Sequence, residues 1–213
     1  MSFNYAYEGI KKLFVGLIIE VVISIMYIVA DAIHLQIISS YDEILETTYS
    51  VIYLISSIIY LLALIIQFIG LYQGGKDEDL FKKAFWTYIG ILLIDGLTVG
   101  LIYVPNIPNL IISLLNTLLS LAAIFAVFFI TEGIISLATE LNEIKIANFG
   151  RVFLGVAISL FMVSTLLNLA PAFFADSEFT VELFAIIESS INVLLYTSLT
   201  FYVGRSLKML KLK

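Results

Sequence analysis

The chain has 213 residues, of which 61% are hydrophobic and 13% are charged, and its mean hydropathy is +1.07. A soluble domain has about a quarter of its residues charged and uses them to cover its surface. The composition therefore excludes a soluble globular protein and predicts a surface covered by lipid. The net charge of -6, with no basic patch interleaved with aromatic residues, argues against nucleic acid as a partner.

Residues that usually carry cofactor or metal chemistry are scarce. Cysteine is absent and histidine occurs once, which excludes disulfides and thiolate nucleophiles and leaves too few side chains for a zinc or haem site. No P-loop, dinucleotide-binding glycine run or G-x-S-x-G motif occurs. We therefore expect no cofactor, no metal site, no catalytic residue and no enzymatic activity, although a serine mechanism, or an aspartyl mechanism through carboxylates that meet in the fold, stays open.

Six stretches are apolar over the ~20 residues that a helix needs to cross a ~30 Å hydrocarbon core. They lie at residues 13–35, 51–73, 84–104, 110–137, 152–174 and 181–203. The predicted fold class is all-α, a polytopic membrane helix bundle with six transmembrane helices in a single membrane domain, residues 1–213. The first stretch is too long for the apolar region of a signal peptide and no cleavage motif follows it, so we expect an uncleaved helix.

Basic residues occur only before the first stretch, after the last, and in alternate breaks between the stretches. Short loops that carry lysine and arginine stay in the cytoplasm. The pattern therefore predicts a multi-pass protein of the cell membrane with both termini in the cytoplasm. The eleven basic residues are Lys11, Lys12, Lys76, Lys82, Lys83, Lys145, Arg151, Arg205, Lys208, Lys211 and Lys213.

A short motif recurs where the first, third and fifth stretches begin: a basic residue stands two positions before a phenylalanine. The recurrence suggests three tandem helical hairpins, with repeats at residues 1–75, 76–141 and 142–213. Basic and aromatic residues are also common anchors at the membrane surface, so chance recurrence stays open beside duplication. The pairs are Lys12/Phe14, Lys83/Phe85 and Arg151/Phe153.

The first stretch carries polar residues on one helix face. Glu20, Ser24, Tyr27, Asp31 and His34 follow one another at steps of four, three, four and three residues. Carboxylates within a membrane helix are costly and mark functional sites by default. Glu20 falls at lipid depth, whereas Asp31 and His34 fall near the outer boundary, where exposure to water is the alternative interpretation.

Similar stripes in other stretches predict a polar interior. Asp95 lies in the third stretch, and Glu188, Asn192 and Tyr196 follow at four-residue steps in the sixth. If these faces meet, they form an acidic cavity open to the outside that favours a cation, an amine or a proton. The expected ligand-binding residues are Glu20, Ser24, Tyr27, Asp31, Asp95, Glu188, Asn192 and Tyr196.

The alternative is that the polar side chains only join helices through interhelical hydrogen bonds. Close packing of helices on small residues is equally compatible with the sequence. The glycines suited to such packing are Gly16, Gly90, Gly96, Gly100 and Gly155.

The six-span layout with both ends inside resembles, in gross topology only, the substrate-binding membrane subunits of energy-coupling-factor vitamin transporters; no individual residue is carried over from them. The leading functional hypothesis is a small membrane transporter or solute-binding subunit for a small, cationic solute. The alternative is a non-catalytic partner protein, an accessory or immunity factor that binds another membrane protein or a second copy of itself. A polar cavity favours the carrier, and a lipid-facing patch of small residues favours the partner.

Overall fold

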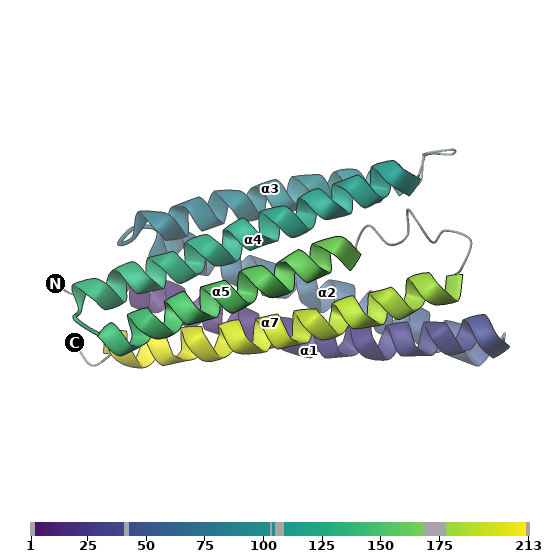
Figure 1. Ribbon diagram of the computed structural model, residues 1–213, viewed down its shortest axis with the longest axis horizontal. Coiled ribbons are helices and arrows are strands. Elements are labelled where there is room, and N and C mark those ends of the chain that lie inside the picture. Colours follow the sequence, from purple (N-terminus) through teal and green to yellow (C-terminus); the bar gives the residue numbers. More distant parts are fainter. Residues whose placement is uncertain (1–2, 41–42, 103, 105–108, 168–177, 212–213) are drawn as a thin grey trace.

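The computed structural model describes residues 3–40, 43–102, 104, 109–167 and 178–211, and all regular secondary structure in these residues is helical. Each of the six helices is long and apolar enough to span a membrane (Figure 1). The predicted fold class, an all-α bundle of six membrane helices, is therefore confirmed. The helices are α1 (Asn4–Ser40), α2 (Glu43–Gly74), α3 (Asp79–Ile102), α4 (Asn109–Glu140), α5 (Ile144–Leu167) and α7 (Glu178–Lys211).

Most of the helices extend beyond the predicted apolar stretches. The longest, α1, has 37 residues, or ~55 Å at 1.5 Å per residue, against ~30 Å of hydrocarbon core. Both termini lie at one end of the bundle (Figure 1). This end also holds the starts of α3 and α5 and the ends of α2 and α4, with every described lysine and arginine, and we call it the basic end.

The helices form a closed ring in chain order. Each one packs against its neighbours in the sequence, and α7 closes the ring against α1. The contact of α1 with α2 is the most extensive and that of α2 with α3 is the least extensive in the ring. Figure 1 shows α3 and α4 diverging from α1 and α7 toward the end opposite the termini. α5 packs more extensively against α4 than against α7, so the arrangement as three tandem hairpins, α1–α2, α3–α4 and α5–α7, stays a prediction, as does their origin by duplication.

The apolar core lies in the half of the bundle that contains the basic end. Fully buried side chains gather there from all six helices, whereas the other half contains few of them. Lipid is as apolar as leucine, so dispersion between closely packed side chains stabilises this core rather than release of water. The core includes Ile10, Leu13, Leu17, Leu71, Phe81, Ile130, Ile134, Leu137, Leu199 and Tyr202.

Glycines bring α1 and α2 into backbone contact near the basic end. A Cβ atom on Gly70 would lie 2.6 Å from the carbonyl oxygen of Gly9 and 2.9 Å from the backbone nitrogen of Leu13. A Cβ atom on Gly9 would lie 2.5 Å from the backbone nitrogen of Gly74. Only hydrogen fits at these positions, as in the close crossings that small residues permit in membranes.

The glycines singled out in the sequence behave differently from one another. Gly16 lies against the side chain of Gln67 in α2 and takes part in the close packing. The other four make no close helix contact within the described chain, because a Cβ atom there would meet no atom within 4 Å. These four are Gly90, Gly96, Gly100 and Gly155.

The turn between α2 and α3 ties the start of α1 to the rest of the basic end. The backbone nitrogen of Ala6 donates a hydrogen bond of 2.8 Å to Oδ2 of Asp77, which caps the first turn of α1. Nζ of Lys12 donates one of 2.7 Å to Oε1 of Gln73. The basic end is thus held by polar contacts as well as by the core.

Candidate functional site

A cavity of about 530 Å³ lies inside the ring, and all six helices contribute to its lining. Asp95 is twelve residues from Lys83, or ~18 Å, and Glu188 is seventeen residues from Arg205, or ~26 Å along the helix axis. The cavity is therefore well separated from the basic end, beyond the apolar core. Its polar lining consists of Tyr27, Tyr53, Ser57, Tyr60, Asp95, Ser120, Ser164, Glu188, Asn192 and Tyr196.

Five of the eight residues proposed from the sequence line this cavity: Tyr27 from α1, Asp95 from α3, and Glu188, Asn192 and Tyr196 from α7. The structure thus brings together polar faces that are far apart in the chain. Whether these side chains bind a ligand stays a prediction. The sequence analysis did not include the tyrosines of α2 in the site, although their spacing places them on one face of that helix.

The other three proposed residues lie outside the cavity. Oγ of Ser24 donates a hydrogen bond of 2.8 Å to the carbonyl oxygen of Glu20, one turn earlier in α1. Glu20 is only 3% exposed and lies beside Gln67 of α2, which is fully buried. Asp31 lies at the contact between α1 and α7.

Glu20 and Gln67 form a second polar site within the apolar half of the bundle. Oε2 of Glu20 and both amide atoms of Gln67 are buried without a hydrogen-bond partner among the described residues. Gln67 lies three residues from Leu64, and Glu20 lies seven residues from Tyr27 on the same helix face; Leu64 and Tyr27 both line the cavity. The pair therefore lies near the cavity on the side of the basic end. An ionised carboxylate in such a place is costly unless a cation or a proton compensates it.

The charged side chains that line the cavity are acidic. Among the described residues, those that line it include two carboxylates and no lysine, arginine or histidine. Oε1 of Glu188 accepts a hydrogen bond of 3.0 Å from Oγ of Ser164 in α5, which fixes its orientation. No described basic residue forms an ion pair with Asp95. Within the described part of the chain, the charged side chains that line the cavity are therefore both acidic.

Aromatic rings provide much of the remaining surface. Tyr27 and Tyr53 approach with ring centroids 5.7 Å apart at an angle of 56°, and Tyr60, Phe161 and Tyr196 complete the aromatic lining. Ring faces carry partial negative charge and attract cations. Carboxylates and aromatic faces thus surround the same volume.

The cavity opens between α2 and α3. Its most exposed lining residues are Tyr53 and Leu61 of α2 and Val99 of α3, which are about half exposed or more. These two helices make the least extensive contact in the ring. Among the described residues, the side of the cavity between α2 and α3 is therefore the least covered.

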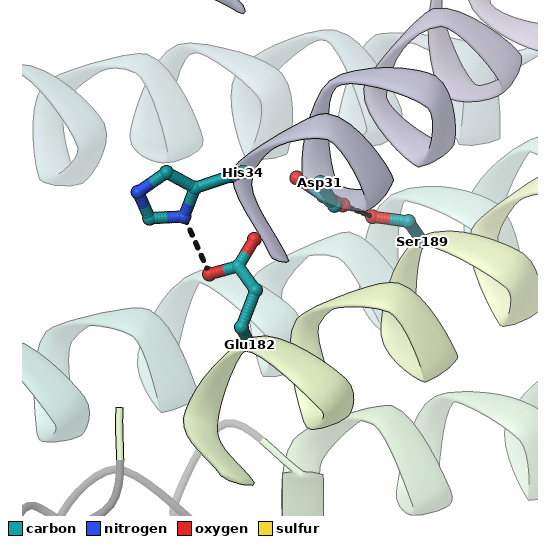
Figure 2. A network of polar contacts seen from close by, with 4 residues as sticks. All are labelled: Asp31, His34, Glu182 and Ser189. Atoms are coloured by element: carbon teal, nitrogen blue, oxygen red, sulfur yellow. Dashed lines mark hydrogen bonds and ion pairs between the residues drawn. The ribbon is translucent and has the colours of Figure 1, made fainter. Parts of the chain in front are cut away.

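Two polar contacts join α1 to α7 (Figure 2). On α1, Asp31 lies four residues farther from the basic end than Tyr27, which lines the cavity. Oγ of Ser189 donates a hydrogen bond of 2.8 Å to Oδ2 of Asp31, and Nδ1 of His34 lies 3.0 Å from Oε2 of Glu182. Asp31 and His34 therefore hold two helices together instead of lining the cavity. Glu182 and Ser189 are seven residues apart on one face of α7, and that spacing is the signal that the sequence analysis missed.

Most of the hydroxyl side chains form hydrogen bonds within their own helix. Within the described residues, most serine and threonine side chains donate to the carbonyl oxygen four residues earlier in their own helix, as Ser56, Thr98 and Thr117 do at 2.8 to 2.9 Å. The hydroxyl groups of Ser164 and Ser189 each donate to a carboxylate of another helix. Polar side chains of the described residues therefore both line the cavity and join helices, as Ser164 and Glu188 do.

No protein-family model matches this chain, and no curated protein or solved structure is significantly similar to it.

Proposed function

We propose that this chain is a membrane carrier or solute-binding subunit whose cavity takes a small organic cation. The observation that supports the proposal best is the cavity itself, which combines Asp95 and Glu188 with four tyrosines and contains no basic residue among its described lining. Its volume of about 530 Å³ lies in the range of ~300–1,000 Å³ that is usual for small-molecule sites.

The two kinds of lining act on different parts of such a solute. The carboxylates attract an ammonium or related group at long range, and the attraction is strong in an interior shielded from water. Tyrosine faces stabilise the same charge by cation–π interaction and accept an apolar body by contact. An anion of the same shape gains the apolar contacts and is repelled by Asp95 and Glu188.

Binding of two ions of matched shape tests the proposal. We expect the detergent-purified protein to bind tetraphenylphosphonium by equilibrium dialysis, and to bind tetraphenylborate at least about tenfold more weakly, since the repulsion by one nearby carboxylate alone is worth more than 1.4 kcal/mol. Equal binding of the two ions would indicate nonspecific apolar adsorption. It would remove the support for a cation site.

The position of the basic residues indicates how the helix bundle is oriented in the membrane. We propose that the basic end faces the cytoplasm, because lysine- and arginine-bearing loops are retained there. The chain contains no cysteine, so single cysteines can be labelled without background. On intact cells, a membrane-impermeant maleimide is expected to label Glu46→Cys, near the start of α2, and to label Lys211→Cys only after permeabilisation. Labelling of Lys211→Cys on intact cells would reverse the orientation.

A second candidate, a partner protein that binds through its helices, is favoured by one edge of α3. Gly96 and Gly100 are exposed one turn apart, and no atom of the described chain covers them. Pairs of small residues at this spacing permit close helix contact. If this edge binds a second copy, light scattering of the detergent complex gives a dimer, and the Gly96→Leu, Gly100→Leu double variant gives a monomer. A monomeric parent would remove self-association from this alternative.

A further inference from the structure

We propose that the groove between α1 and α7 at the basic end binds an anionic phospholipid, with an acyl chain along the groove and the phosphate at Arg205 and Lys208. This inference is independent of the proposed cation site, because the groove lies on the outer surface of the ring and shares no lining residue with the central cavity.

The groove has the surface that an acyl chain needs. It encloses about 570 Å³, and its walls include Ile18 and Val22 from α1 and Thr197 and Phe201 from α7. Ile18, Val22 and Phe201 are 42%, 50% and 58% exposed within the chain. Apolar side chains with such exposure on a membrane helix face lipid, and a concave surface lets a single chain contact several of them at once.

The length of the groove along α7 is close to the thickness of the hydrocarbon layer in one leaflet of a bilayer. From Thr197 to Lys208 is eleven residues, or ~16 Å along α7, and half of the hydrocarbon core is ~15 Å. The cationic side chains lie at one end of this distance and the apolar walls occupy the remainder. A phospholipid has the same division between headgroup and chain, whereas a soluble phosphate would use only the charged end.

The charged end is positioned for a phosphate group. The guanidinium carbon of Arg205 lies 5.5 Å from the ring centroid of Phe149 and 5.2 Å from that of Phe201, which holds the side chain between α5 and α7. Among the described residues, no carboxylate forms an ion pair with Arg205 or Lys208. Arginine donors suit a phosphate with two parallel hydrogen bonds.

Space for the headgroup adjoins these two residues. Arg205 and Lys208 also line a neighbouring hollow of about 380 Å³, to which Lys145 adds a third cation and Glu143 a single carboxylate. The balance of charge therefore favours an anionic headgroup. Basic pockets between membrane helices at the cytoplasmic surface bind such headgroups by the same combination of charges.

Native mass spectrometry of the detergent-purified protein tests the site. We expect retained phosphatidylglycerol to exceed retained phosphatidylcholine of the same chains by about tenfold, on the scale expected for two cations near the headgroup. The Arg205→Gln, Lys208→Gln double variant should lose this preference. The matched control, Lys11→Gln with Lys83→Gln, removes two exposed cations from the same end of the bundle outside the groove and should keep it. Equal retention of both lipids by the parent, or an unchanged preference in the double variant, would overturn the proposal.

Two further experiments distinguish binding of the acyl chain from binding of the phosphate group. Thr197→Trp fills the groove at an exposed position without changing charge, and we expect it to reduce retention of phosphatidylglycerol at least fivefold. Glycerol 3-phosphate, at the same concentration as the lipid, should not compete with phosphatidylglycerol. Unchanged retention by Thr197→Trp, or full competition by glycerol 3-phosphate, would show that the groove does not hold the lipid.

Discussion

We expect Gly70→Ala to lower the thermal unfolding midpoint of the detergent-solubilised protein by ~5–10 °C. The new Cβ atom would lie 2.6 Å from the carbonyl oxygen of Gly9, and backbone atoms on both helices leave no side chain that could move aside. Overpacking of this kind costs ~1–3 kcal/mol, and a loss of 1 kcal/mol lowers the midpoint by ~2–4 °C for a chain of this size. Gly70→Leu should prevent the α1–α2 hairpin from closing.

The matched control is Gly96→Ala, which adds the same methyl group to another helix. A Cβ atom at Gly96 meets no atom within 4 Å, so the variant gains the ~0.5–1 kcal/mol of alanine over glycine in a helix and incurs no clash. Fluorescence-detected size-exclusion chromatography after heating measures both variants. If Gly70→Ala unfolds at the same temperature as Gly96→Ala, the close contact of α1 with α2 is not a determinant of stability.

We expect Asp95→Asn to weaken binding of tetraphenylphosphonium by about tenfold to a hundredfold. Asparagine keeps the size of the side chain and removes its charge, and a pair of unit charges ~5 Å apart gains ~3 kcal/mol at an effective dielectric constant of ~20, before loss of hydration. Binding of tetraphenylborate should rise in the same variant. Equilibrium dialysis of both ions measures the two effects together.

The control for Asp95→Asn is Glu46→Gln, which removes an exposed carboxylate in the first turn of α2, outside the cavity. We expect it to leave binding of both ions within about twofold of the parent, since charges exposed to solvent are largely screened. An equal loss in Glu46→Gln and Asp95→Asn would mean that the overall charge of the protein, and not the cavity, attracts the cation.

The helices could be predicted from the sequence because each must satisfy its backbone within a run of about 20 apolar residues. The full lengths of the helices could not be predicted in this way. The ends of α1 and α7 extend beyond the predicted spans and carry polar residues such as Lys208, because a helix does not have to end where the hydrocarbon ends. Hydropathy locates the lipid boundary and contains little information about what lies beyond it.

The polar face of α1 illustrates what periodicity leaves undetermined. Glu20, Tyr27 and Asp31 share one face of the helix, as predicted, but each meets a different environment. Glu20 lies beside Gln67 of α2, Tyr27 lines the cavity, and Asp31 accepts a hydrogen bond from Ser189 of α7. A straight helix face passes several neighbours when helices diverge, so a shared face does not imply a shared site.

The contacts of individual glycines could not be predicted from the sequence around them either. Gly16 and Gly96 both stand in apolar helices and are equally suited to a close contact by sequence. Gly16 lies against Gln67, whereas Gly96 faces open space. The difference depends on which helices become neighbours in the ring, and that order is decided by long-range packing and not by the residues around each glycine.

Uptake of radiolabelled tetraethylammonium into proteoliposomes tests the carrier proposal most directly, because this cation crosses a lipid bilayer poorly. The account predicts that vesicles with the parent protein accumulate the label faster than protein-free vesicles, and that vesicles with Asp95→Asn accumulate it at the protein-free rate. Uptake by the parent no faster than by protein-free vesicles, or equal uptake by the parent and Asp95→Asn, would contradict a carrier that works through this acidic cavity.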